Sequence, residues 1–349
     1  MNSAAICLGS LVIRWNGIII FFGILAGFFL SYAIYTAHSG RGSVMWVMFA
    51  LSIVSGIVLC RILHFWCNQE MYGSFADVFD GDAGGFFLPV LPLAVAASAL
   101  LACRFGFGAS VNAMLDATAP GLALSMAFIR LSHLFSDVCR SKIRLSSLGF
   151  HSLPVAVKTT DAAGNTEFRF ASFFVSFMIL FAAAIALTAV FYSMRQKGMK
   201  PPCPRYGHIW RLFALIYYSS ELFIDSTRAD STFAYFKFFA GLNKYAAFVS
   251  LTQIAAAVAV ALVFIFYFRC SVSANGKKAY QKIFAVMFIL GLGGTGISEY
   301  LVQRHGNLFY QYYGLMIASI LILDAAILLL LRSCRIGRQK NDSGELKST

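Results

Sequence analysis

Long apolar runs with few charges recur along most of the chain, and they constrain the fold more than any single motif. Each run is close to the roughly 20 residues that an α-helix needs to cross the hydrocarbon core of a bilayer. Hydrophobic residues make up 59% of the 349 residues and charged residues only 12%. A water-soluble domain of this size would lack the polar surface to cover itself. We therefore predict an all-α polytopic integral membrane protein.

The runs predict nine membrane-spanning helices. The first is not preceded by a cationic segment or followed by a small-x-small cleavage site, so we expect it to stay in the membrane instead of being removed as a signal peptide. The fourth and sixth carry charged side chains within their length. The nine runs are Leu11–Tyr35, Met45–Trp66, Phe86–Cys103, Ala113–Phe135, Ala171–Met194, Ile209–Ile224, Tyr245–Arg269, Ile283–Leu301 and Phe309–Leu331.

Basic residues gather on one set of connecting segments. Arg195–Arg211 has five and Arg269–Lys282 four, both without an acid, and the tail after Leu331 has five against two acids. The positive-inside rule places these segments in the cytoplasm, so we predict the N-terminus outside and residues 333–349 as a basic cytoplasmic tail. This topology signal and attraction to anionic lipid account for the net charge of +13. We expect no nucleic-acid partner.

Two longer segments on the predicted outer side, residues 136–170 and 225–244, predict a small extracytoplasmic cap. The first has turn signals at Gly149 and residues 161–165, with the strand-like run Pro154–Thr160 before the second turn. The eight cysteines form no CxxC pair, so we expect no metal and no cofactor. Cys67 and Cys139 both lie on the predicted outer side, so a disulfide between them is one possible pairing.

The fourth run holds an arginine in an otherwise apolar stretch, DATAPGLALSMAFIR from Asp116 to Arg130. A guanidinium at membrane depth is costly, so it normally faces a polar cavity and marks a headgroup, ion or substrate path. The competing interpretation is an arginine that extends to the membrane surface. Asp324 in the last run is the other residue whose charge is costly at membrane depth. It is either a proton or cation site or the partner of a polar group on a neighbouring span.

The stretch from Asp116 to Arg130 resembles the fourth membrane helix of the prolipoprotein diacylglyceryl transferases, a family of bacterial enzymes. In that family the helix has the form Asp-x-x-Ala-Pro-Gly, followed nine residues later by an arginine. The residues in register are Asp116, Ala119, Pro120, Gly121 and Arg130, while Ile129, Ser132 and His133 stand where the family has Gly, Gly and Asn.

Other segments extend this resemblance over residues 1–270. Ile13–Ile18 looks like the Arg-Trp-Tyr-Gly segment that opens the family's first helix, with Asn16 in place of tyrosine. Arg61 matches the arginine of an Ala-Arg-x-x-Tyr run, with His64 at the aromatic position. Ser250 and Gln253 match a Ser-x-x-Gln element. The resemblance implies a seven-span transferase-like core, followed by a two-helix extension at residues 271–332.

The family transfers the diacylglyceryl group of phosphatidylglycerol to the thiol of a lipobox cysteine in a prolipoprotein, and glycerol phosphate leaves. This reaction needs cations around the phosphate and a base that activates the thiol. The resemblance implies that Arg130, Arg14 and Arg61 bind the phosphate of an anionic, phosphatidylglycerol-like lipid. It also implies a prolipoprotein or a lipidated partner, and a place in the bacterial cytoplasmic membrane.

The chain departs from the family at several polar positions. Where the family reads Arg-Phe-x-x-Glu-x-x-Arg, this chain has Glu221, Asp225 and Arg228. The i, i+4, i+7 spacing predicts one helical face that is now net negative. Pro89 occupies the position of a family histidine. These changes indicate that transfer is altered or lost, and the alternative function is a catalytically inactive lipid-binding or accessory membrane protein.

Arg130, His133 and Asp137 form a new constellation at spacing i, i+3, i+7, which predicts one helix face. A histidine between a cation and a carboxylate has the chemistry of a general base. The simpler interpretation is an ion pair at the membrane surface with the histidine between the two charges. A transporter that uses Asp324 is a third possibility, but no pair of Gly/Pro-broken spans in corresponding halves supports it.

Overall fold

The computed structural model confirms an all-α membrane protein. It describes residues 4–8, 11–39, 42–69, 72–79, 85–107, 110–135, 141–146, 149, 151–160, 165–196, 207–229, 249–304 and 309–345. Within these residues there are nine α-helices, and eight helical segments are long and apolar enough to cross a membrane. The helices are α1 Trp15–Ser39, α2 Gly42–Cys67, α3 Leu91–Ala102, α4 Val111–Ser132, α5 Ser172–Gln196, α6 His208–Thr227, α8 Leu251–Asn275, α9 Ala279–Arg304 and α10 Phe309–Glu345.

The sixth predicted span forms α6, which is the helix not counted among those eight. Its 20 residues extend over about 30 Å, the thickness of the hydrocarbon core. Its low mean hydropathy comes from Arg211, Glu221 and Asp225. The side chains of Glu221 and Asp225 are 0% and 1% exposed, so protein and not lipid surrounds them.

Several helix boundaries differ from the sequence-based prediction; the seventh span, for example, forms α8 at Leu251–Asn275 instead of Tyr245–Arg269. The first helix begins at Trp15, because Leu11–Arg14 (β2) pairs antiparallel with Ala4–Leu8 (β1). The β-branched pair Val12–Ile13 favours that strand. The last helix continues beyond Leu331 to Glu345, so the basic tail begins as helix.

The chain divides into two compact units. Unit 1 comprises Met1–Ser193 and Thr227–Thr232, and unit 2 comprises Met194–Ser226 and Phe233–Thr349. Segments of the two units alternate along the chain. Their limits do not test the predicted domain boundary near residue 270, which stays a prediction.

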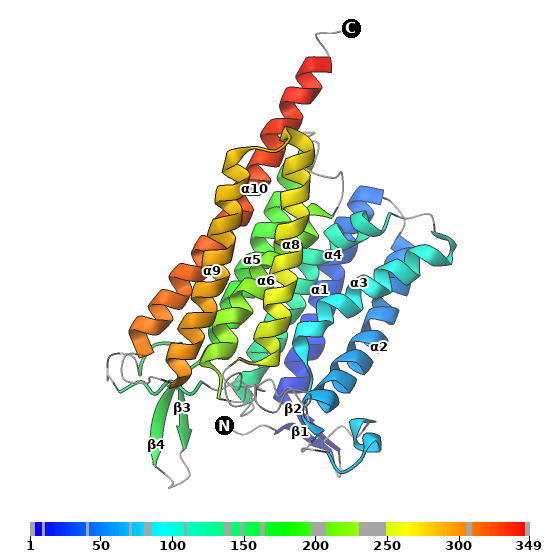
Figure 1. The fold of residues 1–349 in the computed structure, drawn as a ribbon. Coiled ribbons are helices and arrows are strands. Elements are labelled where there is room, and N and C mark those ends of the chain that lie inside the picture. The colour runs from blue at the N-terminus through cyan, green and yellow to red at the C-terminus, as the bar shows by residue number, and fades with distance from the viewer. Residues whose placement is uncertain are drawn as a thin grey trace. The chain divides into compact units, whose positions relative to one another are not determined.

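In unit 1, α1 packs antiparallel against α4 (Figure 1). Gly23, Gly27 and Ser31 recur every four residues on α1, in the small-xxx-small pattern that lets membrane helices approach closely. A Cβ on Gly27 would overlap the Gly121 carbonyl oxygen and the Ser125 hydroxyl of α4. The close approach of these two backbones therefore sets the position of α4 along α1.

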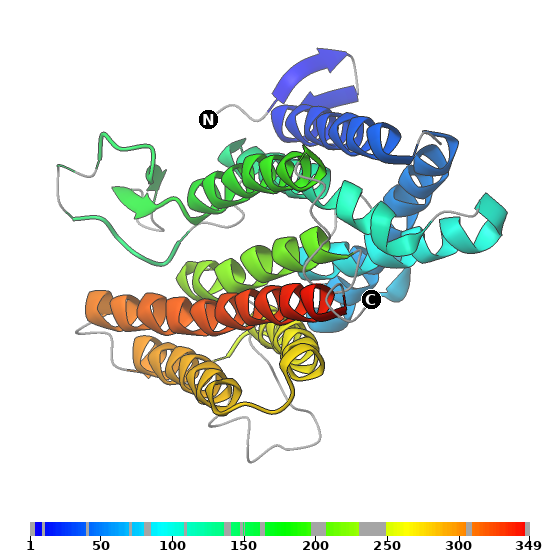
Figure 2. The same ribbon diagram turned by 90° about the horizontal axis from the view of Figure 1, so that it is seen from above.

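Unit 2 contains α8, α9, α10 and nearly all of α6, which Figure 2 shows from above. Gly291 of α9 lies against the backbone of Ser319 and Leu323 in α10. At the far end of α8, the Ser271 and Ser333 hydroxyls are 2.6 Å apart, and Asn275 Nδ2 donates to the Ser333 carbonyl at 3.0 Å. The end of α8 is thereby fastened to α10.

The predicted cap is partly seen. Ala156–Thr160 (β3) and Thr166–Phe170 (β4) pair antiparallel, which confirms the strand predicted within Pro154–Thr160; the turn predicted at residues 161–165 falls almost wholly outside the described residues. Val157 of β3 packs with Leu134 against Ala171 and Phe173 at the start of α5. The second cap segment lies outside the described residues beyond residue 229, so its structure is not addressed.

Candidate functional site

Arg130 lies in the last turn of α4, and its side chain is 2% exposed. Among the described side chains that are nearly fully buried, it stands first by volume. Asp116 and Pro120 lie earlier on the same helix and are also buried. Protein therefore covers the guanidinium, which lies within one turn of the end of the helix.

Arg14 and Arg61 lie at the same end of unit 1 as Arg130. Because α1 and α4 are antiparallel, the start of α1 lies beside the end of α4, and the rings of Trp15 and Phe135 stack there at 6.2 Å. Helix α2 starts near the end of α1 and runs back antiparallel to it, with Phe28 and Phe49 stacked at 4.1 Å. Its later residue Arg61 therefore returns to the level of Arg14, which is exposed.

Arg61 also holds the segment that follows α2. Its Nε donates to the Val78 carbonyl at 2.9 Å and its Nη1 to the Gly85 carbonyl at 3.4 Å. The guanidinium lies 5.3 Å from the centre of the Phe86 ring. The Arg61 side chain is 7% exposed. Arg61 therefore has a structural role in addition to any role of its positive charge.

His64 also helps to hold the segment that follows α2. The Tyr72 hydroxyl lies 2.7 Å from His64 Nδ1, and the Gly85 N–H donates to that nitrogen at 3.3 Å. Between Tyr72 and Gly85, the Asp77 carboxylate accepts hydrogen bonds from the backbone N–H and the hydroxyl of Ser74, and these bonds lower the pKa of the Asp77 carboxyl. The described parts of residues 72–87 are thus fastened to the end of α2 by polar contacts.

Arg228 does not share a helical face with Glu221 and Asp225. Helix α6 ends at Thr227, and Arg228 forms an isolated β-bridge with Ser141 of the cap. The Thr227 carbonyl accepts from Ser141 Oγ at 2.7 Å and from the Lys142 N–H at 3.0 Å. Arg228 is therefore anchored to the cap in unit 1, and the three-residue face predicted from the spacing is wrong at its last member.

The predicted helical face of Arg130, His133 and Asp137 is also interrupted. Helix α4 ends at Ser132, and His133 opens the 3-10 turn His133–Phe135 (η5). Asp137 lies outside the described residues. The catalytic assignment of His133 and Asp137 stays a prediction.

Two family positions with altered residues have local roles. Asn16 Oδ1 accepts from the Gly17 N–H at 2.8 Å in the first turn of α1. Pro89 is buried in the 3-10 turn Leu88–Val90 (η3) that leads into α3. Proline suits this position because its fixed φ is compatible with a helical first turn.

In unit 2, the Ser-x-x-Gln element forms a capping box at the start of α8. Ser250 Oγ accepts from the Gln253 N–H at 3.0 Å, and Gln253 Oε1 accepts from the Ser250 N–H at 3.1 Å. The Ser250 hydroxyl also bonds the Asp225 carboxylate, and Gln253 Nε2 donates to the Leu222 carbonyl at 3.2 Å. Asp225 and Gln253 therefore join α6 to α8. The capping-box spacing was present in the sequence as a signal for this role.

Two more acids lie on helices of unit 2. Asp324 of α10 is half-buried, and the Ser219 hydroxyl of α6 is a neighbouring polar group that favours its charged form, which agrees with a polar partner on another span. Glu299 of α9 is 3% exposed and accepts from Gln303 Nε2 at 2.6 Å. No group of three or more metal-ligating side chains occurs among the residues that the structure describes.

Of the two cysteines considered for a disulfide, Cys67 carries a free thiol. Cys139 lies outside the described residues, so the pairing is untested.

The helices and the buried arginine define a multi-pass membrane protein with a polar site at one end of a helical unit. Residues 3–268 match the family model of the prolipoprotein diacylglyceryl transferases. The chain belongs to this family of transferases in lipoprotein biosynthesis. A search of curated proteins found no match to the chain. The family match ends within α8, so α9 and α10 lie beyond it.

Proposed function

We propose that this chain is a divergent prolipoprotein diacylglyceryl transferase-like protein that binds the phosphate of an anionic, phosphatidylglycerol-like lipid at Arg130. The observation that carries the proposal is the burial of Arg130 in the last turn of α4, where protein and not bulk water surrounds the guanidinium. A cation in such surroundings interacts with a phosphate much more strongly than a cation in water does. Guanidinium groups also bond phosphate oxygens in pairs, which gives orientation as well as affinity.

Arg14 and Arg61 support the phosphate site in this proposal because both lie at the same end of unit 1. Arg61 is oriented by its bonds to the Val78 and Gly85 carbonyls. Arg14 is exposed at the end of β2 and contributes longer-range attraction to the headgroup.

In the family reaction, a cysteine thiolate attacks the glyceryl carbon that bears the phosphate ester. The new C–S bond forms as the C–O bond breaks, the thiol proton passes to a base, and glycerol phosphate leaves with the electron pair. The arginines stabilise the charge that develops on the leaving phosphate. His133 is our proposed base, helped by Asp137.

Pro89 favours a second function, that of a catalytically inactive lipid-binding or accessory membrane protein. A proline buried in η3 replaces the histidine of the family motif and has no side-chain group that transfers a proton. In this alternative the site holds an anionic lipid or a lipidated partner without transferring the diacylglyceryl group.

We place the protein in the bacterial cytoplasmic membrane with its N-terminus outside and its C-terminus in the cytoplasm. The support is the basic composition of Arg195–Arg211, Arg269–Lys282 and the tail. The phosphate site at the start of α1 then faces the outer side, where the thiol of an exported prolipoprotein arrives.

Mass spectrometry of lipid retained by the purified protein tests the headgroup site. Loss of a charged hydrogen-bonding group typically costs about 1.5–3 kcal/mol, so Arg130→Ala should retain roughly tenfold less anionic lipid or lower. Arg130→Lys should fall in between, because an ammonium bonds phosphate as a point charge. Arg104→Ala, which removes an exposed arginine, is the matched control. Equal lipid occupancy in the wild-type, Ala and Lys proteins would refute the role of Arg130.

Rescue of a cell depleted of its own transferase separates the two functions. We expect no rescue by the wild-type chain, because the substitutions at Pro89 and Glu221 change groups of the family motifs. Efficient rescue would exclude the inactive alternative.

A further inference from the structure

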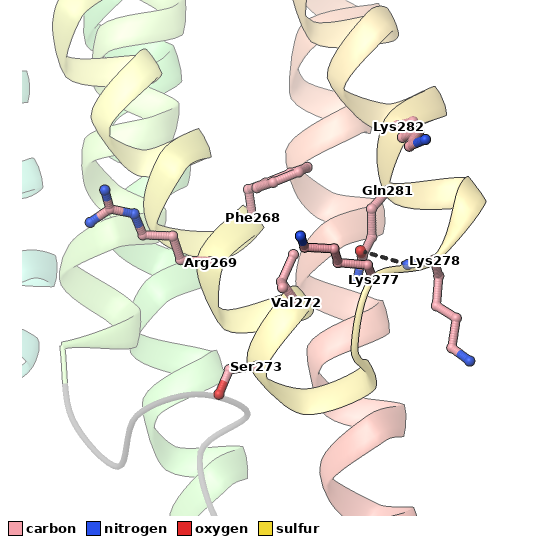
Figure 3. Close-up of a pocket in the computed structure, with 8 residues that line it drawn as sticks. All are labelled: Phe268, Arg269, Val272, Ser273, Lys277, Lys278, Gln281 and Lys282. Carbon is pink, nitrogen blue, oxygen red and sulfur yellow. Dashed lines mark hydrogen bonds between the residues drawn. The ribbon is translucent and has the colours of Figure 1, made fainter.

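A groove with a cationic rim lies at the turn between α8 and α9, within unit 2. Its volume is about 430 Å³, and Phe268 and Val272 of α8 form part of its lining (Figure 3). In Figure 3 the Lys277 side chain runs back from the turn toward Val272, while Lys278 extends away from the groove. The four basic residues of the lining are Arg269, Lys277, Lys278 and Lys282, and all four are exposed.

The turn that carries Lys277 and Lys278 is fixed by Gln281, which is 2% exposed. Gln281 Oε1 accepts from the Lys278 N–H at 3.0 Å. Its Nε2 donates to the Gly276 carbonyl at 3.0 Å and to Ser271 Oγ at 3.1 Å. Gly276 has a φ of +65°, in the left-handed region that favours glycine. The backbone that presents the lysines is therefore held in one conformation.

The charge around the groove is of one sign. The sequence has no acidic residue between Asp230 and Glu299, so α8, the turn and the first half of α9 carry no carboxylate. Helix α10, fastened to the end of α8 at Ser333, continues with Arg335, Arg338 and Lys340 before the first acid, Asp342. Asp342 is nine residues after Ser333, a rise of about 14 Å along the helix. Helix α8, the turn and the first half of α9 therefore supply no counter-charge to the cations.

We propose that this groove binds the headgroup of an anionic phospholipid from the cytoplasmic leaflet. The groove lies where α8 and α9, both candidate spans, end and begin, which is the depth of lipid headgroups. Lysines at that depth attract an anionic phosphate, and Phe268 and Val272 provide apolar contact for the glycerol and the first acyl carbons. The four cations follow residue 268, where the family match ends, and they belong to unit 2, whereas Arg130 belongs to unit 1.

Photo-crosslinking in lipid nanodiscs tests the groove directly. The intact protein is placed in phosphatidylcholine that contains a low mole fraction of a photoreactive phosphatidylglycerol, and labelled peptides are identified by mass spectrometry. We expect labelling within residues 268–282. A cation near an anionic surface contributes about fivefold in affinity. Because Lys277 is the one of the two that lies along the groove, Lys277→Ala with Lys278→Ala should lower this labelling by about fivefold or more.

Three matched comparisons make the result decisive. Lys277→Arg with Lys278→Arg keeps the charge and should keep most labelling. Arg104→Ala with Lys158→Ala removes two exposed cations elsewhere and should leave labelling of residues 268–282 unchanged. Arg130→Ala should also leave it unchanged, whether or not Arg130 binds lipid.

Equal labelling in the wild-type and Lys277→Ala/Lys278→Ala proteins would overturn the proposal, and so would equal loss in the Arg104→Ala/Lys158→Ala control. Soluble glycerol phosphate added at millimolar concentration should not compete, because it lacks the acyl chains. If it abolishes labelling, the groove is a site for a soluble phosphate and the lipid assignment is wrong.

Discussion

Gly27 of α1 and Gly121 of α4 meet backbone to backbone, and neither position has room for a Cβ. On Gly121 that atom would overlap the Gly27 carbonyl oxygen and the Ser31 hydroxyl. The contact lies about two and a half helical turns from Arg130 along α4, since Gly121 and Arg130 are nine residues apart. The position of the buried guanidinium therefore depends on a contact between two residues without side chains.

The first prediction concerns this contact. Gly121→Val should destabilise the protein by about 1–3 kcal/mol, because backbone atoms cannot move aside as a flexible side chain does. Thermal unfolding in detergent measures the change. Gly17→Ala is the control on α1, since a Cβ there would meet no atom within 4 Å. Equal midpoints for wild type and Gly121→Val would show that the two helices do not approach as closely as the structure indicates.

Arg61 should act mainly as a structural residue. Arg61→Lys keeps the charge but cannot reach both the Val78 and Gly85 carbonyls, so the segment they belong to should open more often. We expect faster amide hydrogen exchange at Phe87, whose N–H donates to the Cys60 carbonyl at 3.0 Å. Arg130→Ala serves as the comparison and should leave exchange at Phe87 unchanged. Unchanged exchange in Arg61→Lys would mean that the two carbonyl contacts do not hold the segment.

Ser250 should stabilise the junction of α6 and α8. Ser250→Ala removes the N-cap of α8, which typically costs about 0.5–2 kcal/mol, and it also removes a hydroxyl from the buried Asp225 carboxylate. Ser250→Thr keeps a hydroxyl and should unfold close to wild type. A double-mutant cycle with Asp225→Asn measures how much of the loss comes from the Ser250–Asp225 bond. Additive losses would assign the whole effect to the cap.

The fourth prediction is that α6 crosses the membrane. Topology reporters fused after Lys200 and after Lys244 should then report opposite sides, with Lys200 in the cytoplasm. A reporter at the C-terminus should be active only in the cytoplasm. If Lys200 and Lys244 report the same side, α6 does not cross and the protein has eight spans.

The sequence by itself determined the class of protein and most of the helix positions. A hydrophobic run of about 20 residues is a local property, and lipid is the only surrounding that accommodates several of them. The strand at Ala156–Thr160 and the capping box of Ser250 and Gln253 follow from short-range spacing in the same way. The motif around Pro120 and Arg130 was sufficient to indicate the family, because it depends on residue types at fixed intervals.

Only the tertiary structure decided what those residues touch. Spacing placed Arg228 on a helix with Glu221, whereas α6 ends at Thr227 and Arg228 pairs with Ser141, 87 residues earlier. Arg61 matched a family arginine in the sequence, but its bonds to the Val78 and Gly85 carbonyls depend on how the chain returns over the end of α2. Local pattern specifies helices because their hydrogen bonds join residues four apart. Contacts across the chain are set by the packing of whole helices, which no short window of sequence contains.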